Sequence, residues 1–206
     1  MKFLKTAVTG SAGSGKSIVR KKLAELGMAG FDCDEIAREI VRPGMPAFRE
    51  ITRLLGEKSV APDGTLDRAR VRRIIIDDSD MRKRVENILH PLILEELFLK
   101  MEDARSLGYT AAVAEVPLLF EMNLESRFDL TIAVVADHDT LLRRLVHRDG
   151  VEQDGAEKIL KLQLDQKDKE RRADVVIHNN AGREELYEAV VQVYGKIEKE
   201  LLTSEP

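Results

Sequence analysis

The amino-acid sequence predicts an α/β fold, namely a doubly wound five-stranded parallel sheet with an inserted helical lobe and a helical lid. Five apolar segments of strand length are spread along the 206 residues, and segments with helical periodicity separate them. A glycine-rich loop joins the first apolar segment to the first helical one. A long, charged helical stretch interrupts the alternation between the second and third strands. These observations indicate one globular unit whose sheet is covered on both faces.

The first strand and the first helix flank the glycine-rich loop. Residues 3–8 are apolar and compatible with a β-strand, and residues 17–26 carry apolar side chains at helical spacing. A short second strand is expected to end near Phe31, before a helix over residues 35–41. This order of strand, loop, helix and strand is typical of an α/β sheet.

A helical lobe is predicted over residues 43–107. Its charged helical patterns cover residues 46–56, 66–77 and 81–107, and the last of these is expected to be interrupted at His90–Pro91. The lobe is therefore interpreted as an insertion between two strands of the sheet.

The second half of the chain returns to the sheet. Residues 109–115 and 130–136 are continuous apolar runs, as expected for buried parallel strands, and residues 174–177 supply a last short strand. Residues 143–172 are charged and poor in bulky apolar side chains, which favours a solvated helical lid that moves. A closing helix over residues 183–202 has one apolar face, formed by Leu186, Val190, Val193 and Ile197. The predicted segments are a core (1–42, 108–142 and 173–206), the lobe (43–107) and the lid (143–172).

The composition limits the classes of partner. The chain has 33 basic and 37 acidic residues, a net charge of −4, so no overall charge attracts it to nucleic acid or to an anionic membrane. The apolar run at the amino terminus stops too early for a signal peptide or a membrane span. Its single cysteine, Cys33, cannot form an internal disulfide, which suits a reducing compartment. We expect a cytoplasmic protein, by default a monomer.

The glycine-rich loop fits the pattern G-x-x-x-x-G-K-[ST] and lies between a strand and a helix, as a P-loop requires. Glycines let backbone N–H groups approach phosphate oxygens, and the helix N-terminus favours negative charge. Lys16 is expected to neutralise the β and γ phosphates, and the Ser17 hydroxyl to bind Mg²⁺. The alternative, a turn that only connects strand to helix, does not explain why lysine and serine follow the last glycine. The predicted ATP-binding residues of the loop are Gly10, Ser11, Ala12, Gly13, Ser14, Gly15, Lys16 and Ser17.

Asp32 and Asp34 are candidates for acid–base work beside the bound phosphates. Residues two apart at the end of an extended strand point to the same side, so both carboxylates are expected at the cleft above the sheet. The alternative is that either aspartate caps the following helix. The guanine-reading motifs of GTPases are absent from the sequence, which favours a small-molecule kinase.

Several motifs together resemble the dephospho-CoA kinase family, which phosphorylates the ribose 3′-hydroxyl of dephospho-CoA with ATP. Residues 32–38 (DCDEIAR) resemble the D-x-D-x-I-A-R segment of that family. In the same order along the chain, residues 90–93 (HPLI), 116–121 (VPLLFE), 144–149 (RLVHRD), Gln163 and 173–177 (ADVVI) are similar to further family motifs. The resemblance covers roughly residues 4–182, and it implies that ATP and Mg²⁺ are required.

The resemblance implies roles for individual residues. Asp34 would be the base that faces the 3′-hydroxyl, while Asp32 would support the acceptor or the metal; the residues alone allow either assignment. Arg144 and Arg148, four residues apart on a helix, would face the transferring phosphate from the lid. The alternative for both is a solvated face with ion pairs. If the protein is a kinase, as the resemblance implies, the catalytic residues are Lys16, Asp32, Asp34 and Arg148.

The acceptor is expected to meet both the lobe and the sheet. The resemblance assigns His90 to the acceptor pocket, although local chemistry alone favours packing at a helix end. Pro117, Leu118 and Leu119 follow a buried strand and would form an apolar wall against dephospho-CoA. Glu115 is either a water-mediated partner of magnesium or simply exposed at the end of its strand.

Two other functions remain open from sequence. One is a nucleoside or nucleoside-monophosphate kinase, which shares the frame and the lid. The other is a regulator that binds ATP without transfer chemistry, which would keep its function when Asp34 is replaced. Activity with dephospho-CoA, compared with a panel of nucleosides and monophosphates, separates these alternatives.

Overall fold

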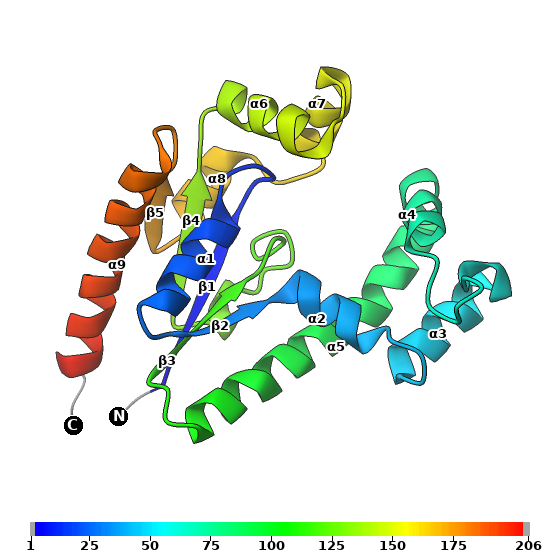
Figure 1. Ribbon diagram of the computed structural model, residues 1–206, viewed down its shortest axis with the longest axis horizontal. Coiled ribbons are helices and arrows are strands. Elements are labelled where there is room, and N and C mark those ends of the chain that lie inside the picture. The colour runs from blue at the N-terminus through cyan, green and yellow to red at the C-terminus, as the bar shows by residue number, and fades with distance from the viewer. Residues whose placement is uncertain (1–2, 204–206) are drawn as a thin grey trace. The chain divides into compact units, whose positions relative to one another are not determined.

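A computed structural model describes residues 3–203 of the chain (Figure 1), so residues 1–2 and 204–206 of the predicted core lie outside the described part. The chain divides into two compact units, Met1–Phe31 with Met101–Pro206 and, separately, Asp32–Lys100. The strands are β1 (Leu4–Gly10), β2 (Ala29–Asp32), β3 (Ala111–Glu115), β4 (Leu130–Val135) and β5 (Val175–His178). The α-helices are α1 (Lys16–Glu25), α2 (Cys33–Ile40), α3 (Pro46–Leu55), α4 (Arg68–Asp77), α5 (Ser79–Ser106), α6 (His138–Asp149), α7 (Gln153–Lys161), α8 (Gln166–Arg172) and α9 (Arg183–Thr203). Two short 3₁₀ turns are η1 (Glu57–Ser59) and η2 (Glu125–Arg127).

The predicted five-stranded parallel sheet is confirmed, with strand order β2-β3-β1-β4-β5. Strand β1 is central, and its Val8 pairs with Glu115 of β3 on one side and with Ile132 of β4 on the other. β1 continues to Gly10, two residues further than the apolar run alone predicts. The strands therefore end together at one edge, where the glycine-rich loop begins.

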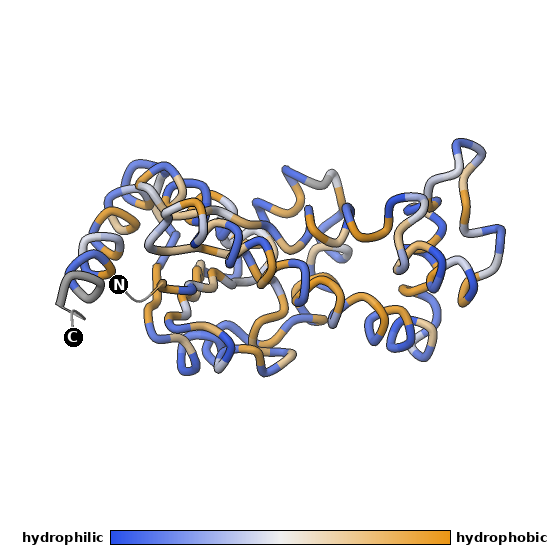
Figure 2. Tube along the Cα trace, turned by 90° about the horizontal axis from the view of Figure 1, so that it is seen from below, coloured by the Kyte–Doolittle hydropathy of each residue, from blue (hydrophilic) through white to orange (hydrophobic). Residues whose placement is uncertain are grey.

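Helices α1 and α9 cover one face of the sheet. Apolar side chains of both helices pack with those of β1, β3, β4 and β5 in one cluster, which confirms the predicted apolar face of the closing helix. That face consists of Leu186, Val190, Val193 and Ile197, all of them buried. Figure 2 shows hydrophobic and hydrophilic residues alternating along the helical turns, as expected for helices with one buried side. Among the helices within residues 3–203, none is long and apolar enough to span a membrane.

The second unit is helical and has a small core of its own, formed by Ile51, Leu66 and Val85. Helix α5, of which Ser79–Lys100 belongs to this unit, runs through Pro91 without a break, so the predicted interruption at His90–Pro91 is wrong. A proline inside a helix removes one backbone hydrogen bond and costs roughly 3 kcal/mol. Buried side chains on both sides of it, Val85 and Leu97, offset this cost and keep the helix continuous.

The lid region differs in part from the solvated segment that its composition predicts. Helices α6 and α7 pack on each other through Leu142, Leu145 and Ala156, which are buried. Helix α8 packs against β4, and its Lys169 has no exposed surface. The composition of α8 does not predict this packing, because the side chain that the helix buries is a lysine.

Candidate active site

A cavity of about 870 Å³ opens beside the glycine-rich loop within the first unit. The loop contributes Gly13, Gly15, Lys16 and Ser17 to its lining, helix α6 contributes among others Arg144 and Arg148, and the segment after β5 contributes residues 179–183. The structure thus brings both predicted lid arginines to the same cavity as the loop. Gly10, Ser11, Ala12 and Ser14 are not among its lining residues, and Ser11 and Ser14 are buried.

Gly15 is the residue at which the loop turns into α1. Its φ of 96° lies in the left-handed region, and a Cβ at this position would come within 2.4 Å of Asn179 Nδ2. Only glycine fits both constraints. No side chain caps α1, and its first turn carries no acidic residue, so the N–H groups at this end can bind an anion.

Asn179, directly after β5, contacts the glycine-rich loop. Its side-chain amide donates a hydrogen bond to Ser14 O at 2.7 Å, and its own Oδ1 accepts one from Arg144 at 3.4 Å. Arg144 also donates to Gly13 O at 3.3 Å. These contacts give the carbonyl groups of Gly13 and Ser14 hydrogen-bond donors within the protein, so these oxygens need no donor from a ligand.

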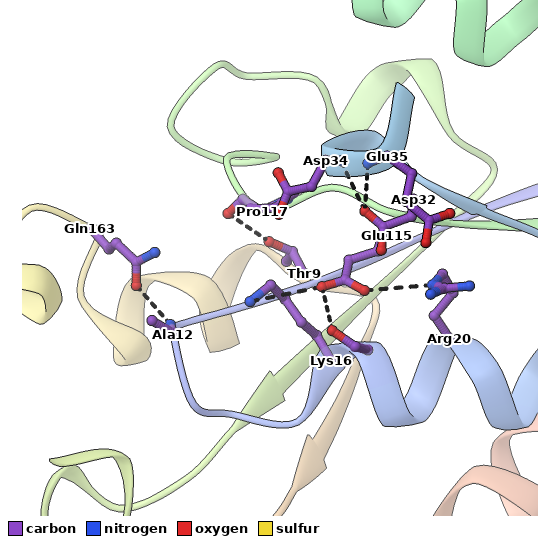
Figure 3. A network of polar contacts seen from close by, with 11 residues as sticks. Thr9, Ala12, Lys16, Arg20, Asp32, Asp34, Glu35, Glu115, Pro117 and Gln163 are labelled. Atoms are coloured by element: carbon purple, nitrogen blue, oxygen red, sulfur yellow. Dashed lines mark hydrogen bonds and ion pairs between the residues drawn. The ribbon is translucent and has the colours of Figure 1, made fainter. Parts of the chain in front are cut away.

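Gln163, which the sequence singles out only by family resemblance, touches the loop directly. Its Oε1 accepts a hydrogen bond from Ala12 N at 2.9 Å (Figure 3). The segment between α7 and α8 is therefore tied to the glycine-rich loop in this structure.

Glu115, at the end of β3, is the acidic centre of the site. It is only 4% exposed, so the alternative of simple exposure at a strand end is wrong. Its Oε1 accepts a hydrogen bond from the Ser17 hydroxyl at 2.8 Å and lies 4.0 Å from Lys16 Nζ, while Oε2 lies 3.5 Å from Arg20 Nε (Figure 3). Two cations compensate the buried carboxylate, which would otherwise be costly to desolvate.

The oxygen atoms of Ser17 and Glu115 fit a magnesium ion better than a transition metal. Within residues 3–203 there is no group of three or more His, Cys, Asp or Glu side chains arranged to hold a metal. Mg²⁺ commonly keeps several waters and uses one or two protein oxygens together with substrate phosphates. A hydroxyl and a carboxylate beside a phosphate-binding loop satisfy that requirement.

Asp32 caps helix α2. The helix begins at Cys33, so the residues after Asp32 are not extended, and the argument that strand alternation aligns Asp32 with Asp34 is wrong. Asp32 Oδ1 accepts hydrogen bonds from Asp34 N at 2.9 Å and Glu35 N at 3.3 Å (Figure 3). Asp34 therefore lies in the first turn of α2, and Cys33 is buried as expected of a core residue.

The remaining predicted site residues lie in different surroundings. His90 is half-buried within α5, and burial lowers its pKa below the usual 6.5, although the charge of Glu86 acts in the opposite direction. Pro117 and Leu118 are partly exposed after β3, whereas the Leu119 side chain is fully buried. Only Pro117 and Leu118 therefore present surface to a ligand; Leu119 supports them from within.

Sequence reasoning missed Asn179 and Arg20. The available signal for Asn179 was its position two residues after the last predicted strand, at the edge where the carboxyl ends of parallel strands meet. For Arg20, the only signal in the sequence was its spacing of four residues from Lys16 along α1, which places both side chains on one side of the helix.

Comparison with known proteins is consistent with this geometry. The family model for dephospho-CoA kinase matches residues 4–185. A relative from Geobacter sulfurreducens named dephospho-CoA kinase is 39% identical over 189 residues, which cover 92% of this chain and 96% of the relative. Another of that name, from Shouchella clausii, is 35% identical over 193 residues, 94% of this chain and 98% of the relative. A crystal structure of a Thermus thermophilus protein aligns with a TM-score of 0.80 and 28% identity, over 95% of this chain and 98% of that one.

Proposed function

Because this chain belongs to the dephospho-CoA kinase family, we propose that its glycine-rich loop binds ATP with Mg²⁺ for transfer to the ribose 3′-hydroxyl of dephospho-CoA. The family catalyses the ATP-dependent phosphorylation of dephospho-CoA to CoA, the last step of CoA biosynthesis. The observation that carries the residue assignments is the cavity lined by the loop and by the lid arginines.

The loop and the lid would share the neutralisation of the triphosphate. The N–H groups of the α1 N-terminus and Lys16 would supply donors and positive charge from the loop, and Arg148 and Arg144 would do so from α6. Phosphoryl transfer depends mainly on positioning and charge neutralisation, so donors on two sides suit its transition state.

Ser17 would hold the magnesium ion, with Glu115 beside it. The ion held there would neutralise charge that develops on the phosphate oxygens during transfer. The Ser17 hydroxyl donates a hydrogen bond to Glu115, so the lone pairs of the serine oxygen are left to the ion. The Glu115 carboxylate would be a water-mediated partner of the ion.

Asp34 would orient the acceptor hydroxyl and take its proton, while Asp32 supports the acceptor or the metal and also caps α2. Little proton removal is needed early in a loose transition state, so orientation is the larger part of the role of Asp34. His90, Pro117 and Leu118 would bind the rest of the acceptor, with Leu119 supporting Leu118.

A turnover assay with dephospho-CoA and ATP tests the function. The expected result is ADP release with dephospho-CoA as acceptor, and an NMR spectrum of the product that locates the new phosphate at the ribose 3′ position. Turnover restricted to nucleosides or nucleoside monophosphates would contradict it.

Two variants separate a kinase from an ATP-binding regulator. Asp34→Ala is expected to lower kcat by about 10²–10⁴-fold while ATP affinity is largely kept, because the carboxylate acts on the acceptor. Lys16→Ala is expected to lose both ATP affinity and turnover. A regulator would keep its function in Asp34→Ala and lose it only in Lys16→Ala.

We also propose that the protein acts as a monomer in the cytoplasm. The single cysteine, which cannot form an internal disulfide, supports a reducing compartment. Size-exclusion chromatography with light scattering tests the oligomeric state, and a mass of twice the chain would contradict the monomer.

A further inference from the structure

Helix α8 carries a buried lysine that the proposed chemistry does not use. Lys169 has no exposed surface, and its Nζ lies 3.1 Å from Oε1 of Glu121. Lysine is almost never fully buried unless it is paired. Lys169 is not among the residues that line the nucleotide cavity, so its charge serves another purpose.

The partner, Glu121, belongs to the segment that follows β3. We call residues 117–125 the wall loop, because Pro117 and Leu118 form the proposed apolar wall. Glu121 Oε1 also accepts a hydrogen bond from Leu164 N at 2.9 Å. One carboxylate oxygen is thus held both by the α8 ammonium group and by a backbone amide just before α8. In buried surroundings such contacts are strong, and losing one partner is costly.

Arg172, one turn after Lys169, reaches the same loop. Its guanidinium donates to Phe120 O at 2.8 Å and to Asn123 Oδ1 at 2.8 Å, contacts the carboxylate of Glu125, and lies 5.0 Å from the centre of the Phe120 ring. Asn123 has a φ of 53°, a left-handed conformation that needs support from its surroundings. Two cations three residues apart on α8 therefore hold the wall loop along its length.

Backbone hydrogen bonds within the wall loop connect Leu118 to the residues that α8 contacts. Met122 N donates to Leu118 O at 3.1 Å, and Leu124 N donates to Leu119 O at 2.9 Å. Residues 117–123 form turns and belong to no strand or helix, so the sheet alone does not fix their conformation. The contacts from α8 supply the restraint that regular secondary structure does not.

We propose that Lys169 and Glu121 are positioning residues for the acceptor: together with Arg172 they hold the wall loop so that Pro117 and Leu118 are preorganised to bind dephospho-CoA. This inference rests on the proposed function, because it takes Pro117 and Leu118 as acceptor contacts. Preorganisation lowers the cost of ordering a loop on binding, so its loss weakens the binding of the acceptor and leaves ATP binding intact.

Glu121→Gln and Lys169→Met test the inference by steady-state kinetics. The glutamine keeps an oxygen for Leu164 N and loses only the charge, and the methionine keeps the length of the lysine stem. In each variant KM for dephospho-CoA is expected to rise on the order of tenfold, with kcat and KM for ATP within about twofold of wild type. Titration calorimetry with dephospho-CoA is expected to show the same loss of affinity.

Lys167→Met is the matched control, because it removes the same charge from the same helix at an exposed position. It is expected to leave all three kinetic parameters unchanged. The double variant Glu121→Gln/Lys169→Met leaves no buried charge unpaired, so it keeps the test informative if Lys169→Met does not fold. The fold-change in its KM for dephospho-CoA should resemble that of either single variant. It should stay well below the product of the two single-variant fold-changes, because the two residues act as one unit.

Two results would overturn the inference. One is a KM for dephospho-CoA within twofold of wild type in both Glu121→Gln and the double variant, with circular dichroism showing that they are folded. The other is an equal rise of both KM values with a fall in kcat, which indicates a general structural role. In both cases the proposed function still stands if the wild-type protein turns over dephospho-CoA. If the wild-type protein does not turn over dephospho-CoA, both the proposed function and this inference are wrong.

Discussion

At the scale of single residues, Gly15 shows how backbone conformation creates the nucleotide site. Gly15→Ala would place a Cβ in a left-handed conformation and against the Asn179 amide. We expect a loss of roughly 1–3 kcal/mol in unfolding free energy and a loss of ATP affinity of at least about tenfold. Denaturant unfolding and nucleotide titration measure the two effects.

Gly56→Ala is the matched control for this prediction. Gly56 has a φ of 81°, but no atom lies within 4 Å of an added Cβ. The variant therefore has backbone strain outside the loop and no collision, and we expect unchanged ATP affinity. Equal ATP affinity in Gly15→Ala and Gly56→Ala would mean that the loop conformation is not needed for binding.

Asp32 has two proposed roles, and two substitutions separate them. Asp32→Ala removes the cap of α2 and should cost about 1 kcal/mol of unfolding free energy, whereas Asp32→Ser keeps a capping oxygen and should restore most of it. If the carboxylate also supports the acceptor or the metal, both variants lose turnover. Wild-type turnover in Asp32→Ser would show that capping is the whole role.

His90 makes stability depend on pH. Burial lowers its pKa in the folded protein below 6.5, so the unfolded chain binds its proton more readily than the folded one. The contribution to stability is therefore complete above pH 6.5 and is lost as the pH falls through the lower, folded-state pKa. His90→Gln is expected to flatten the fall in melting temperature over this range in a thermal scan. An unchanged slope of melting temperature against pH would mean that His90 is not the cause of this pH dependence.

At the scale of elements, the sequence predicted the strands well and the junctions poorly. Buried parallel strands have continuous apolar runs, so β3 and β4 were found within two residues of their bounds. The start of α2 was misplaced because strand and helix join without a loop and a single aspartate makes the turn. The helix α5 was wrongly divided because local rules penalise Pro91, whereas tertiary packing maintains the helix.

The site was predicted unevenly for a related physical reason. Lys16, Ser17 and the glycines are neighbours in sequence, so their spacing alone indicates the chemistry. Asn179 and Lys169 act through contacts with Ser14 and Glu121, which are distant in sequence. Nothing near Lys169 in the sequence distinguishes it from the exposed lysines around it.

The helices of the lid should respond differently to ligands. Helix α8 is already attached to β4, since Gln166 exchanges hydrogen bonds with Ala136 N at 3.0 Å and Ala136 O at 2.6 Å. Helix α7 instead packs on α6, where Glu157 Oε1 lies 3.1 Å from His138 Nε2, and is followed by Leu162, which is 74% exposed. With ATP and dephospho-CoA together, we expect amide exchange to slow in α7 and the second half of α6, and to change little in α8. Unchanged exchange throughout residues 143–172 would argue against closure of the lid.

At the scale of the whole molecule, the nucleotide cavity belongs to one of the two compact units. Its lining residues all lie in Met1–Phe31 or Met101–Pro206, and none lies in Asp32–Lys100. Each unit has its own apolar cluster, one around Val8 and Val190 and the other around Ile51 and Val85. A ligand stabilises only the conformations that bind it, so ATP should oppose opening of the first unit more than opening of the second.

Native-state hydrogen exchange can measure this difference. At an ATP concentration of 100 times its Kd, the free energy of opening should rise by about 2.7 kcal/mol for amides of β1, α1 and β4, and by much less for amides of α3 and α4. Lys16→Ala, with ATP affinity removed, should show no rise in either unit and is the control for non-specific effects of the nucleotide. An equal rise in both units would mean that the protein opens only as a whole, because the residues that line the cavity all belong to the first unit.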